Sequence, residues 1–515
     1  MSFLSVKFLA FLVASFMFYF ICPKKFKWVV LLAFSLAYYY LVSHNLIIVL
    51  MGITLITYVA GYLLNRNNQK LKNNPDKDKL KELKDEVKKN NKIIQTIAVV
   101  LILGTLVFIK YAGFLAENVN LLGLSLPVLS FVLPLGLSFF TLQAISYVID
   151  VSKNKCEGQT NFFKFLLYMA YFPQLTQGPI PRYSKLAPQL YEGHDFDYKR
   201  VTYGLQLMGW GFIKKAVLAD RLSIVVSTIF DTPENSYGLM VLFGALLYSV
   251  QIYGDFSGGI DIIRGISEVF GIELEDNFRQ PYFSRSIEEF WRRWHITLGS
   301  WMKDYVFYPM SLSRTLSVIG KKARKVFGDN IGKKIPPVIA MFTVYLLVGI
   351  WHGASWKYVI YGIWNGVFIA GGILLESKYA SMRKSFKVKE DSKGWAVFQM
   401  IRTYFICSIG RIFSRAVDTG TAFQLFSNMF NMNGKSISFN ELGLDYKNWI
   451  VAILVSLLVL YIDYRKEKGD NVRDKIANMP IIVRWVIYYA LIFIILIFGY
   501  YGPEYNVANF IYGRF

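Results

Sequence analysis

Long apolar runs without charged residues recur along this chain and restrict what it can fold into. A helix that crosses the hydrocarbon core of a bilayer needs about 20 consecutive apolar residues. The sequence is 54% hydrophobic and 18% charged, whereas soluble domains carry about 25% charged residues. It therefore predicts an all-α polytopic membrane protein with roughly ten to twelve helices that cross or enter the bilayer. The candidate runs are residues 6–22, 28–44, 46–64, 93–109, 128–149, 204–230, 237–253, 336–356, 358–375, 395–412, 447–462 and 481–500.

Basic segments between these runs predict how the chain is oriented. Residues 66–92, which we expect to form a solvated charged helix, contain ten basic and five acidic residues, and residues 313–334 contain seven basic and one acidic. Lys- and Arg-rich loops stay on the cytoplasmic side, so we expect both segments, with 23–27 and 464–475, to face the cytoplasm of a multi-pass plasma-membrane protein. The net charge of +22 then reflects orientation and the anionic lipids of the bilayer. Nucleic-acid binding is not expected.

The amino-acid composition changes between residues 130 and 380, where glycine, proline and isolated charges interrupt the apolar runs. Residues 170–190 contain four prolines and cannot form one straight helix. Non-helical backbone at membrane depth is tolerated only against protein or a water-filled cavity. We therefore expect a single integral-membrane domain over 1–515, with scaffold spans in 1–110, a catalytic core in 130–380 and C-terminal spans in 395–515.

The cysteines do not indicate a metal site or a disulfide framework. Cys22, Cys156 and Cys407 lie far apart, and no Cys-x-x-Cys pair is present. We expect no bound metal, and we interpret the three thiols as small apolar side chains.

The stretch WRRWHITLGSWMKDYVFYPM contains one of only four histidines in the chain, His295. At 100° per residue, residues 287–305 form an amphipathic helix of interfacial type, with three tryptophans on its apolar face. His295 points with that face. By itself the stretch favours a histidine packed for structural reasons inside the aromatic cluster.

A second histidine, His352, changes this interpretation because it lies near the end of the otherwise apolar run 336–356. Lys334 marks the cytoplasmic edge of that run, and 18 residues of helix extend about 27 Å, which would place His352 far from the cytoplasm. An ionisable residue in a spanning segment is a functional hypothesis by default. Gly349 and Gly353 flank His352 and would let another group approach the backbone.

The segment LYSVQIYGDFSGGIDIIRG, residues 247–265, places further polar groups at or near a span. Asp255 and Arg264 could form an ion pair, or they could line a polar tunnel with Gln251 and Ser257. No nucleophile-elbow pattern surrounds Ser257, so a serine nucleophile is not supported.

These stretches together resemble the membrane-bound O-acyltransferase superfamily. The resemblance rests on DNFRQPYFSRSIEEFWRRWHITLGSWMKDYVFYPMSL and GIWHGASWKYVIYGIWNG, and also on PLGLSFFTLQAISYVID, YFPQLTQGPIPR and QIYGDFSGGID. The bacterial alginate O-acetyltransferase branch is the most similar, followed by the D-alanyl-lipoteichoic-acid branch. The sequence departs from the first branch at Gly259-Ile260 and at Asn365, so the acceptor stays open.

The resemblance implies a ring of helices around a central tunnel with the two histidines at a constriction. His352 corresponds to the catalytic histidine, and His295 would orient it, hold the acyl carbonyl or bind the acceptor. Other residues of the same stretches would contact the substrates. These are Trp291, Arg292, Trp294, Trp301, Asp255, Ser257, Gln251, Trp351, Gly353 and Asn365.

The resemblance also implies a reaction, O-acylation of an extracellular or cell-wall polysaccharide. No cofactor would stay bound, and acetyl-CoA or an acyl carrier protein thioester would be the donor. Because the chain lacks a Gly-Asp-Ser motif, we expect an extracellular SGNH-type acetyltransferase partner together with polysaccharide export machinery. Three alternatives stay open: D-alanyl transfer to teichoic acid, transport, and a scaffold in a secretion complex.

Overall fold

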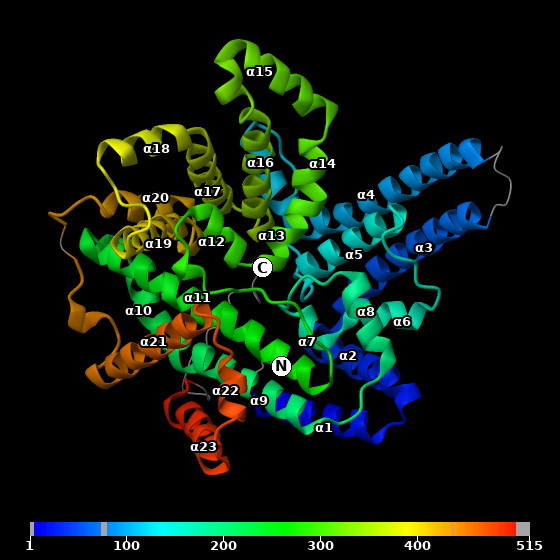
Figure 1. The fold of residues 1–515 in the computed structure, drawn as a ribbon, viewed down its shortest axis with the longest axis horizontal. Helices are drawn as coiled ribbons and strands as arrows, with labels where there is room; N and C mark the ends of the chain where they lie inside the picture. Colours follow the sequence, from blue (N-terminus) through cyan, green and yellow to red (C-terminus); the bar gives the residue numbers. More distant parts are fainter. Residues whose placement is uncertain (1–4, 74–79, 435, 501–515) are drawn as a thin grey trace. The chain divides into compact units, whose positions relative to one another are not determined.

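The computed structural model describes residues 5–73, 80–434 and 436–500, and within them the chain is helical (Figure 1). These residues form no β-strand, and their one isolated bridge joins Phe278 and Trp294. The predicted all-α class is confirmed. The described residues fall into two compact units, each with its own core. Unit 1 comprises the described residues up to Met208 together with Ile260–Glu275, and unit 2 comprises Gly209–Gly259 and the described residues from Asp276 onward.

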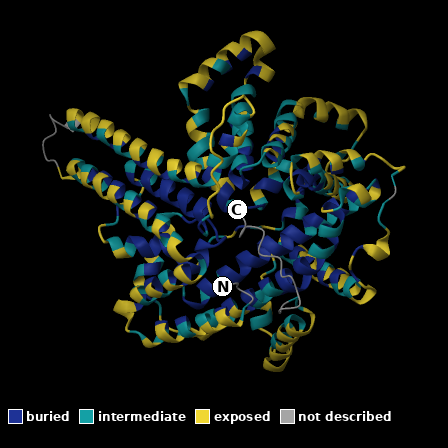
Figure 2. Cartoon of the chain, turned by 180° about the vertical axis from the view of Figure 1, so that it is seen from behind, coloured by how far each residue is buried: buried dark blue, intermediate teal, exposed yellow. Residues whose placement is uncertain are grey.

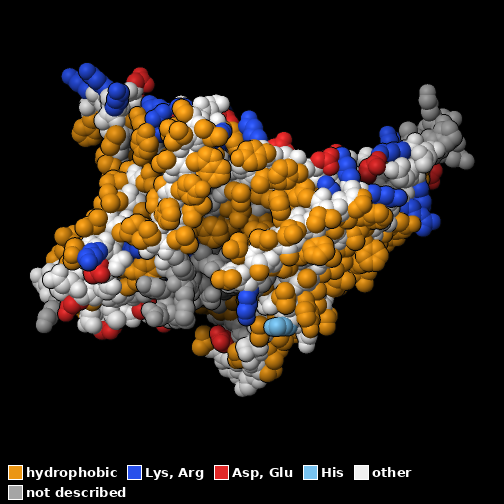
Figure 3. All heavy atoms as spheres, turned by 90° about the horizontal axis from the view of Figure 1, so that it is seen from below, with side chains coloured by type: hydrophobic (Ala, Val, Ile, Leu, Met, Phe, Trp, Pro, Cys, Tyr) orange, Lys and Arg blue, Asp and Glu red, His pale blue; other side chains and the backbone are white. Residues whose placement is uncertain are grey.

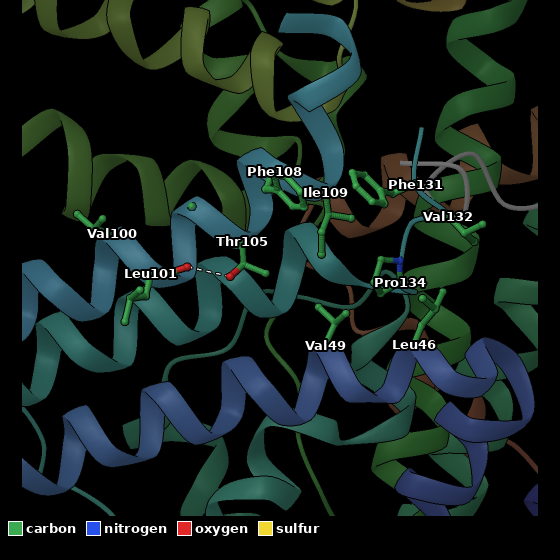
Figure 4. A pocket seen from close by; sticks show the side chains of 11 residues that line it. Leu46, Val49, Val100, Leu101, Thr105, Phe108, Ile109, Phe131, Val132 and Pro134 are labelled. Atoms are coloured by element: carbon green, nitrogen blue, oxygen red, sulfur yellow. Dashed lines mark hydrogen bonds between the residues drawn. The ribbon is translucent and has the colours of Figure 1, made fainter. Parts of the chain in front are cut away.

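Unit 1 is built around a largely apolar helix, α5 (Leu137–Ser152), whose residues from Leu137 to Val148 are all buried. α3 and α4 pack against it. A 740 Å³ apolar pocket lies between α3, α4 and the non-helical residues 131–134, and Figure 4 shows Leu46 and Phe108 among its lining. The other helices of this unit are α1 (Val6–Ile21), α2 (Lys27–Ser43), α3 (Ile47–Lys72), α4 (Leu80–Asn120), α6 (Phe162–Ala170), α7 (Phe172–Leu175), α8 (Tyr183–Glu192) and most of α9 (Tyr198–Phe212).

The helices of unit 1 are interrupted in the proline-rich stretch, as the sequence predicted, and in two further places. The proline-rich stretch 170–190 is divided between α6, α7 and α8, as predicted. The predicted run 128–149 is wrong at its start, because residues 124–134 are not helical and α5 begins only at Leu137. Residues 66–92 do not form one helix: α3 ends at Lys72 with Asn73 as its cap, and α4 begins at Leu80. Residues 74–79, between these two helices, lie outside the described residues.

Unit 2 contains the two histidine stretches. Its helices are α10 (Asp220–Phe230), the first part of α11 (Leu239–Val269), α12 (Ile287–Arg293), α13 (Ile296–Met302), α14 (Tyr308–Ser311), α15 (Arg314–Gly332), α16 (Ile335–His352), α17 (Trp356–Leu374), α18 (Glu376–Ser385), α19 (Lys393–Arg415), α20 (Thr419–Asn428), α21 (Tyr446–Glu467), α22 (Val472–Ala477) and α23 (Ile481–Phe498). A π-helical segment, Ile213–Ala219, joins α9 to α10. π-Bulges are often found at functional sites.

Several helices present apolar surface outward, as a bilayer requires. Within the described residues, seven helical segments are long and apolar enough to cross a membrane, and α1 and α5 are shorter apolar helices. α23 contains no buried residue, although it is the most hydrophobic of these segments, and Figure 2 draws it in the exposed and intermediate colours. Hydrophobic side chains also dominate the face drawn in Figure 3. Such surface is stable against lipid rather than water.

α16 and α17 form the hairpin that carries His352. They meet through small residues: a Cβ built on Gly349 would touch the Tyr358 carbonyl and lie 2.9 Å from the Cα of Gly362. Close backbone approach through small residues is how helices pack without a hydrophobic driving force in a membrane.

We expect Gly349→Val to force α16 and α17 apart and to lower the stability of the fold by about 1–3 kcal/mol, the usual cost of overpacking. Gly371→Val in α17 is the matched control, because no atom lies within 4 Å of a Cβ built there. Thermal unfolding of the purified variants measures the difference. Equal melting temperatures would contradict the close helix contact.

Candidate active site

The stretch that carries His295 is not one helix. α12 and α13 are separated by Trp294 and His295, and the backbone of His295 lies in the left-handed region at φ 50° and ψ 51°. The predicted continuous amphipathic helix over residues 287–305 is therefore wrong. A left-handed backbone costs a non-glycine residue about 1–2 kcal/mol, so neighbouring contacts must stabilise it.

Pairing with a distant loop explains the break. The Ile296 amide donates to the Asn277 carbonyl at 3.0 Å, and Phe278 and Trp294 form the antiparallel bridge. These hydrogen bonds satisfy backbone groups that a continuous helix would have satisfied internally. The tertiary pairing overrides the helical periodicity of the sequence, which contains no sign of it.

Asn277 also orients the imidazole of His295. Its Oδ1 atom accepts hydrogen bonds from the backbone amide of Thr297 at 3.0 Å and from its hydroxyl at 2.9 Å, which identifies this atom as the amide oxygen. The Nδ1 atom of His295 lies 3.3 Å from the same oxygen. Because an amide oxygen only accepts, we assign the proton to Nδ1 and the basic lone pair to Nε2.

His295 is buried in an aromatic environment. It is 1% exposed, and its ring lies 4.9 Å from that of Phe256 and 5.8 Å from that of Trp351. Burial first, and then the neighbouring His352, lower the pKa of His295 well below its ordinary value. His295 lies outside every candidate span. Because its pKa is lowered well below the ordinary value, the imidazole of His295 is neutral near pH 7.

His352 is the last residue of α16, so the expected unbroken helix of 18 residues from Ile335 is confirmed. Its ring packs 5.2 Å from Trp351, 6.1 Å from Tyr361 and 6.4 Å from Tyr358. Trp351 thus contacts both histidines, and the fold brings together two residues that are far apart in the sequence. A Cβ on Gly353 would meet the ring of Tyr358, so this position tolerates no side chain without movement.

Three of the predicted substrate-contacting residues, Trp291, Trp294 and Asn365, pack in the aromatic surroundings of the histidines. The indole of Trp291 donates to Asn365 at 3.1 Å, which ties α12 to α17. Trp294 stacks on Phe290 with ring centres 5.4 Å apart. These contacts assign the three residues at least a structural role.

Trp301 and Arg292, also predicted to contact the substrates, differ in how far they are buried. Trp301 is 6% exposed and packs on Tyr305. Arg292 points away from the histidines: it is largely exposed and lies 3.8 Å from Glu288. The structure therefore does not bring Arg292 to this site.

The acidic residue predicted on α11 belongs to a buried ionic cluster. Asp255 pairs with Lys215 at 2.5 Å, and Lys215 also pairs with Asp220 at 2.7 Å. Ser257 accepts a hydrogen bond from Lys214 at 2.9 Å and donates to a backbone carbonyl. The cluster ties α11 to the π-helical segment Ile213–Ala219.

Gln251 lies on the same helix as the cluster. It is buried, and its Oε1 atom has no hydrogen-bond partner among the described residues. α11 contacts His295 through Phe256.

Sequence reasoning missed two residues near this site, Asn277 beside His295 and Arg411 beside Trp294. Asn277 gave no signal beyond its place in the stretch that resembles the family. Arg411 lies in α19, is 2% exposed, and places its guanidinium 4.5 Å from the ring centre of Trp294 and 5.3 Å from that of Phe290. A buried cation is stabilised by aromatic faces and hydrogen bonds, and Arg411 also donates to the Tyr282 hydroxyl at 3.0 Å. Its place in the predicted apolar run 395–412, which also contains Arg402, was the available clue.

Comparison with known proteins gives the same family as the sequence motifs, the membrane-bound O-acyltransferases. A model of the membrane-bound O-acyltransferase family matches residues 53–321, more than half of the chain. The chain is 30% identical to "Probable alginate O-acetylase AlgI" of Pseudomonas syringae over 73% of this chain and 70% of that protein. It is 30% identical to the "Peptidoglycan O-acetyltransferase" of Helicobacter pylori over 67% of this chain and 65% of that protein. It is 25% identical to the "Teichoic acid D-alanyltransferase" of Bacillus subtilis over 54% and 68%.

The buried imidazole predicts a loss of stability in acid. Because folding lowers the pKa of His295, its contribution is complete above the unfolded value of about 6.5 and is lost as the pH falls. We expect His295→Gln, which keeps a donor toward Asn277, to make the melting temperature less dependent on pH between about 7 and 5. The matched control is His44→Gln, since His44 is exposed. Thermal unfolding of purified protein measures this, and parallel wild-type and His295→Gln profiles would contradict it.

Proposed function

Because the chain belongs to the membrane-bound O-acyltransferase family and is an O-acyltransferase, we propose that it acetylates hydroxyl groups of an extracellular polysaccharide. The observation that carries the proposal is the pair of buried histidines, His295 and His352, which both contact the ring of Trp351. The names of the relatives support the substrate class, since two of the three describe acetyl transfer to cell-surface glycans.

The proposed chemistry requires one base and a site that excludes water. The acceptor hydroxyl attacks the thioester carbonyl, the new ester C–O bond forms and the C–S bond breaks. His352 takes the hydroxyl proton and returns it to the departing thiolate. General base catalysis of this kind contributes about 10²–10⁴-fold. The aromatic walls around Trp351 exclude water, so that the acyl group reaches the acceptor rather than being hydrolysed.

His295 has a supporting role in this scheme. Its neutral imidazole, held by Asn277 through Nδ1, orients the acceptor or the acyl carbonyl. A neutral ring suits this task because a cation beside His352 would disfavour the proton that His352 must accept.

The donor and the partners belong to the same proposal. Acetyl-CoA, or an acyl carrier protein, supplies the thioester from the cytoplasm, and the acceptor arrives from outside. An extracellular SGNH-type acetyltransferase and the polysaccharide export machinery complete the transfer. The helix from Lys334 to His352 supports this arrangement, because 18 helical residues extend about 27 Å.

D-alanyl transfer to teichoic acid is the second candidate. The favouring observation is the 25% identity to a D-alanyltransferase, over a smaller share of this chain than the acetyltransferase matches cover. Transport and a purely scaffolding role gain no support from the histidine pair.

We expect His352→Ala to reduce thiol release from acetyl-CoA by at least about 100-fold, because it removes the base. The measurement uses purified protein in vesicles with a polysaccharide acceptor, and a D-alanyl carrier protein as the alternative donor. The control is His44→Ala at an exposed histidine, and an unchanged melting temperature of His352→Gln shows that the fold is kept. Undiminished acetyl transfer in both His352 variants would refute the assignment. Turnover of the D-alanyl donor alone would favour the second candidate.

We also expect residues 313–334 and the helix ends on either side of residue 76 to face the cytoplasm, because basic segments resist translocation. Single cysteines introduced at Lys322 and Lys84, both exposed, should react with a membrane-impermeant maleimide only after the cells are opened. A cysteine at Asn45 is the positive control, because one span separates Asn45 from the basic segment 23–27 and is expected to place it outside. Labelling of Lys322 or Lys84 sites in intact cells would reverse the proposed orientation.

A further inference from the structure

A second pocket, in unit 1 and apart from the histidines, has a volume of 530 Å³. It lies where the 3₁₀ turn Lys24–Phe26 meets α2, α6 and the end of α8. Pockets of about 300–1,000 Å³ are the usual size for small-ligand sites. Its lining comprises Lys24, Lys25, Phe26, Trp28, Val29, Lys164, Tyr191 and Glu192.

The charges of this pocket are unbalanced. Three ammonium groups, those of Lys24, Lys25 and Lys164, face one carboxylate, that of Glu192. Among the residues that the structure describes, no carboxylate lies within ion-pairing distance of any of the three lysines. Like charges gathered without a partner disfavour the empty pocket and favour an anion in it.

A neighbouring lysine shows the contrast. Lys27 is 4% exposed, donates to the His194 carbonyl at 2.8 Å and lies 3.4 Å from Asp195. Its charge is thus used inside the protein. The three pocket lysines differ because Lys24 and Lys25 are exposed and Lys164 is partly exposed.

The remaining lining indicates the depth of the pocket in the membrane. The ammonium of Lys164 lies 5.8 Å from the ring centre of Trp28 and 5.3 Å from that of Tyr191. Tryptophan and tyrosine beside lysine are typical of the headgroup level of a bilayer. The candidate span Lys24–Lys72 begins here, and Phe26 and Val29 leave exposed apolar surface at the rim.

We propose that this pocket binds the phosphate of an anionic phospholipid. The lysines hold the phosphate oxygens, the two aromatic rings border the glycerol region, and Phe26 and Val29 contact the start of the acyl chains. A soluble phosphate would use the same lysines, but it would not need the apolar rim. Basic pockets between membrane helices bind anionic headgroups in this way.

The test is native mass spectrometry of the purified full chain in micelles that contain phosphatidylglycerol and phosphatidylcholine in equal amounts. Wild-type protein should retain phosphatidylglycerol preferentially. Combining Lys24→Gln, Lys25→Gln and Lys164→Gln should lower that preference by at least ~5-fold, the factor for about one lysine contact at a headgroup. Lys84→Gln, Lys88→Gln and Lys89→Gln together are the matched control, since they remove equal charge from exposed positions on α4.

Three results would overturn the proposal. The first is an unchanged preference in the pocket variant, and the second is an equal loss in the α4 control, which would indicate non-specific attraction. The third is binding of inorganic phosphate, added at tens of millimolar, without any preference for phosphatidylglycerol, which would assign the pocket to a soluble phosphate ligand. An unchanged melting temperature of the pocket variant excludes unfolding as the cause of a loss.

Discussion

The geometry of the two histidines depends on the pairing between residues 277–279 and the end of α12. This pairing stops the helix at Trp294, places His295 in the left-handed region, and presents the Asn277 side chain to its ring. Strained backbone of this kind persists only where surrounding contacts over-determine it, and it is concentrated at functional sites. A continuous helix would have carried His295 onto a different face, away from Trp351 and His352.

The second constraint is that a buried charged side chain needs partners, and unit 2 provides such partners in two ways. Arg411 is enclosed by the faces of Trp294, Phe290 and Tyr282 and by one hydroxyl acceptor. Lys215 instead has two carboxylate partners. Removal of one partner from a buried ion pair costs about 3–5 kcal/mol, because the remaining charge is left uncompensated. Each of these buried charges therefore depends on its partners being kept in place.

The bilayer explains why the outward-facing helices differ in composition from the surroundings of the histidines. Outward-facing helices such as α23 are apolar and expose most of that surface, while polar side chains gather where helices meet. The hairpin of α16 and α17 is tight because Gly349 and Gly362 allow the backbones to touch. His352 thus sits at the end of an unbroken, closely supported helix, which would be a rigid position for the catalytic base that we propose.

By itself, the sequence determined the fold class, the positions of most helices, the family and the two histidines, because hydropathy, proline content and motif spacing are local properties. It also predicted the unbroken helix that ends at His352. Only the tertiary structure decided the break at His295, the partner of Asp255 and the outward orientation of Arg292. It alone revealed Asn277 and Arg411 as neighbours of the site. These features depend on contacts between segments that are distant in sequence, and helical periodicity carries no information about such contacts.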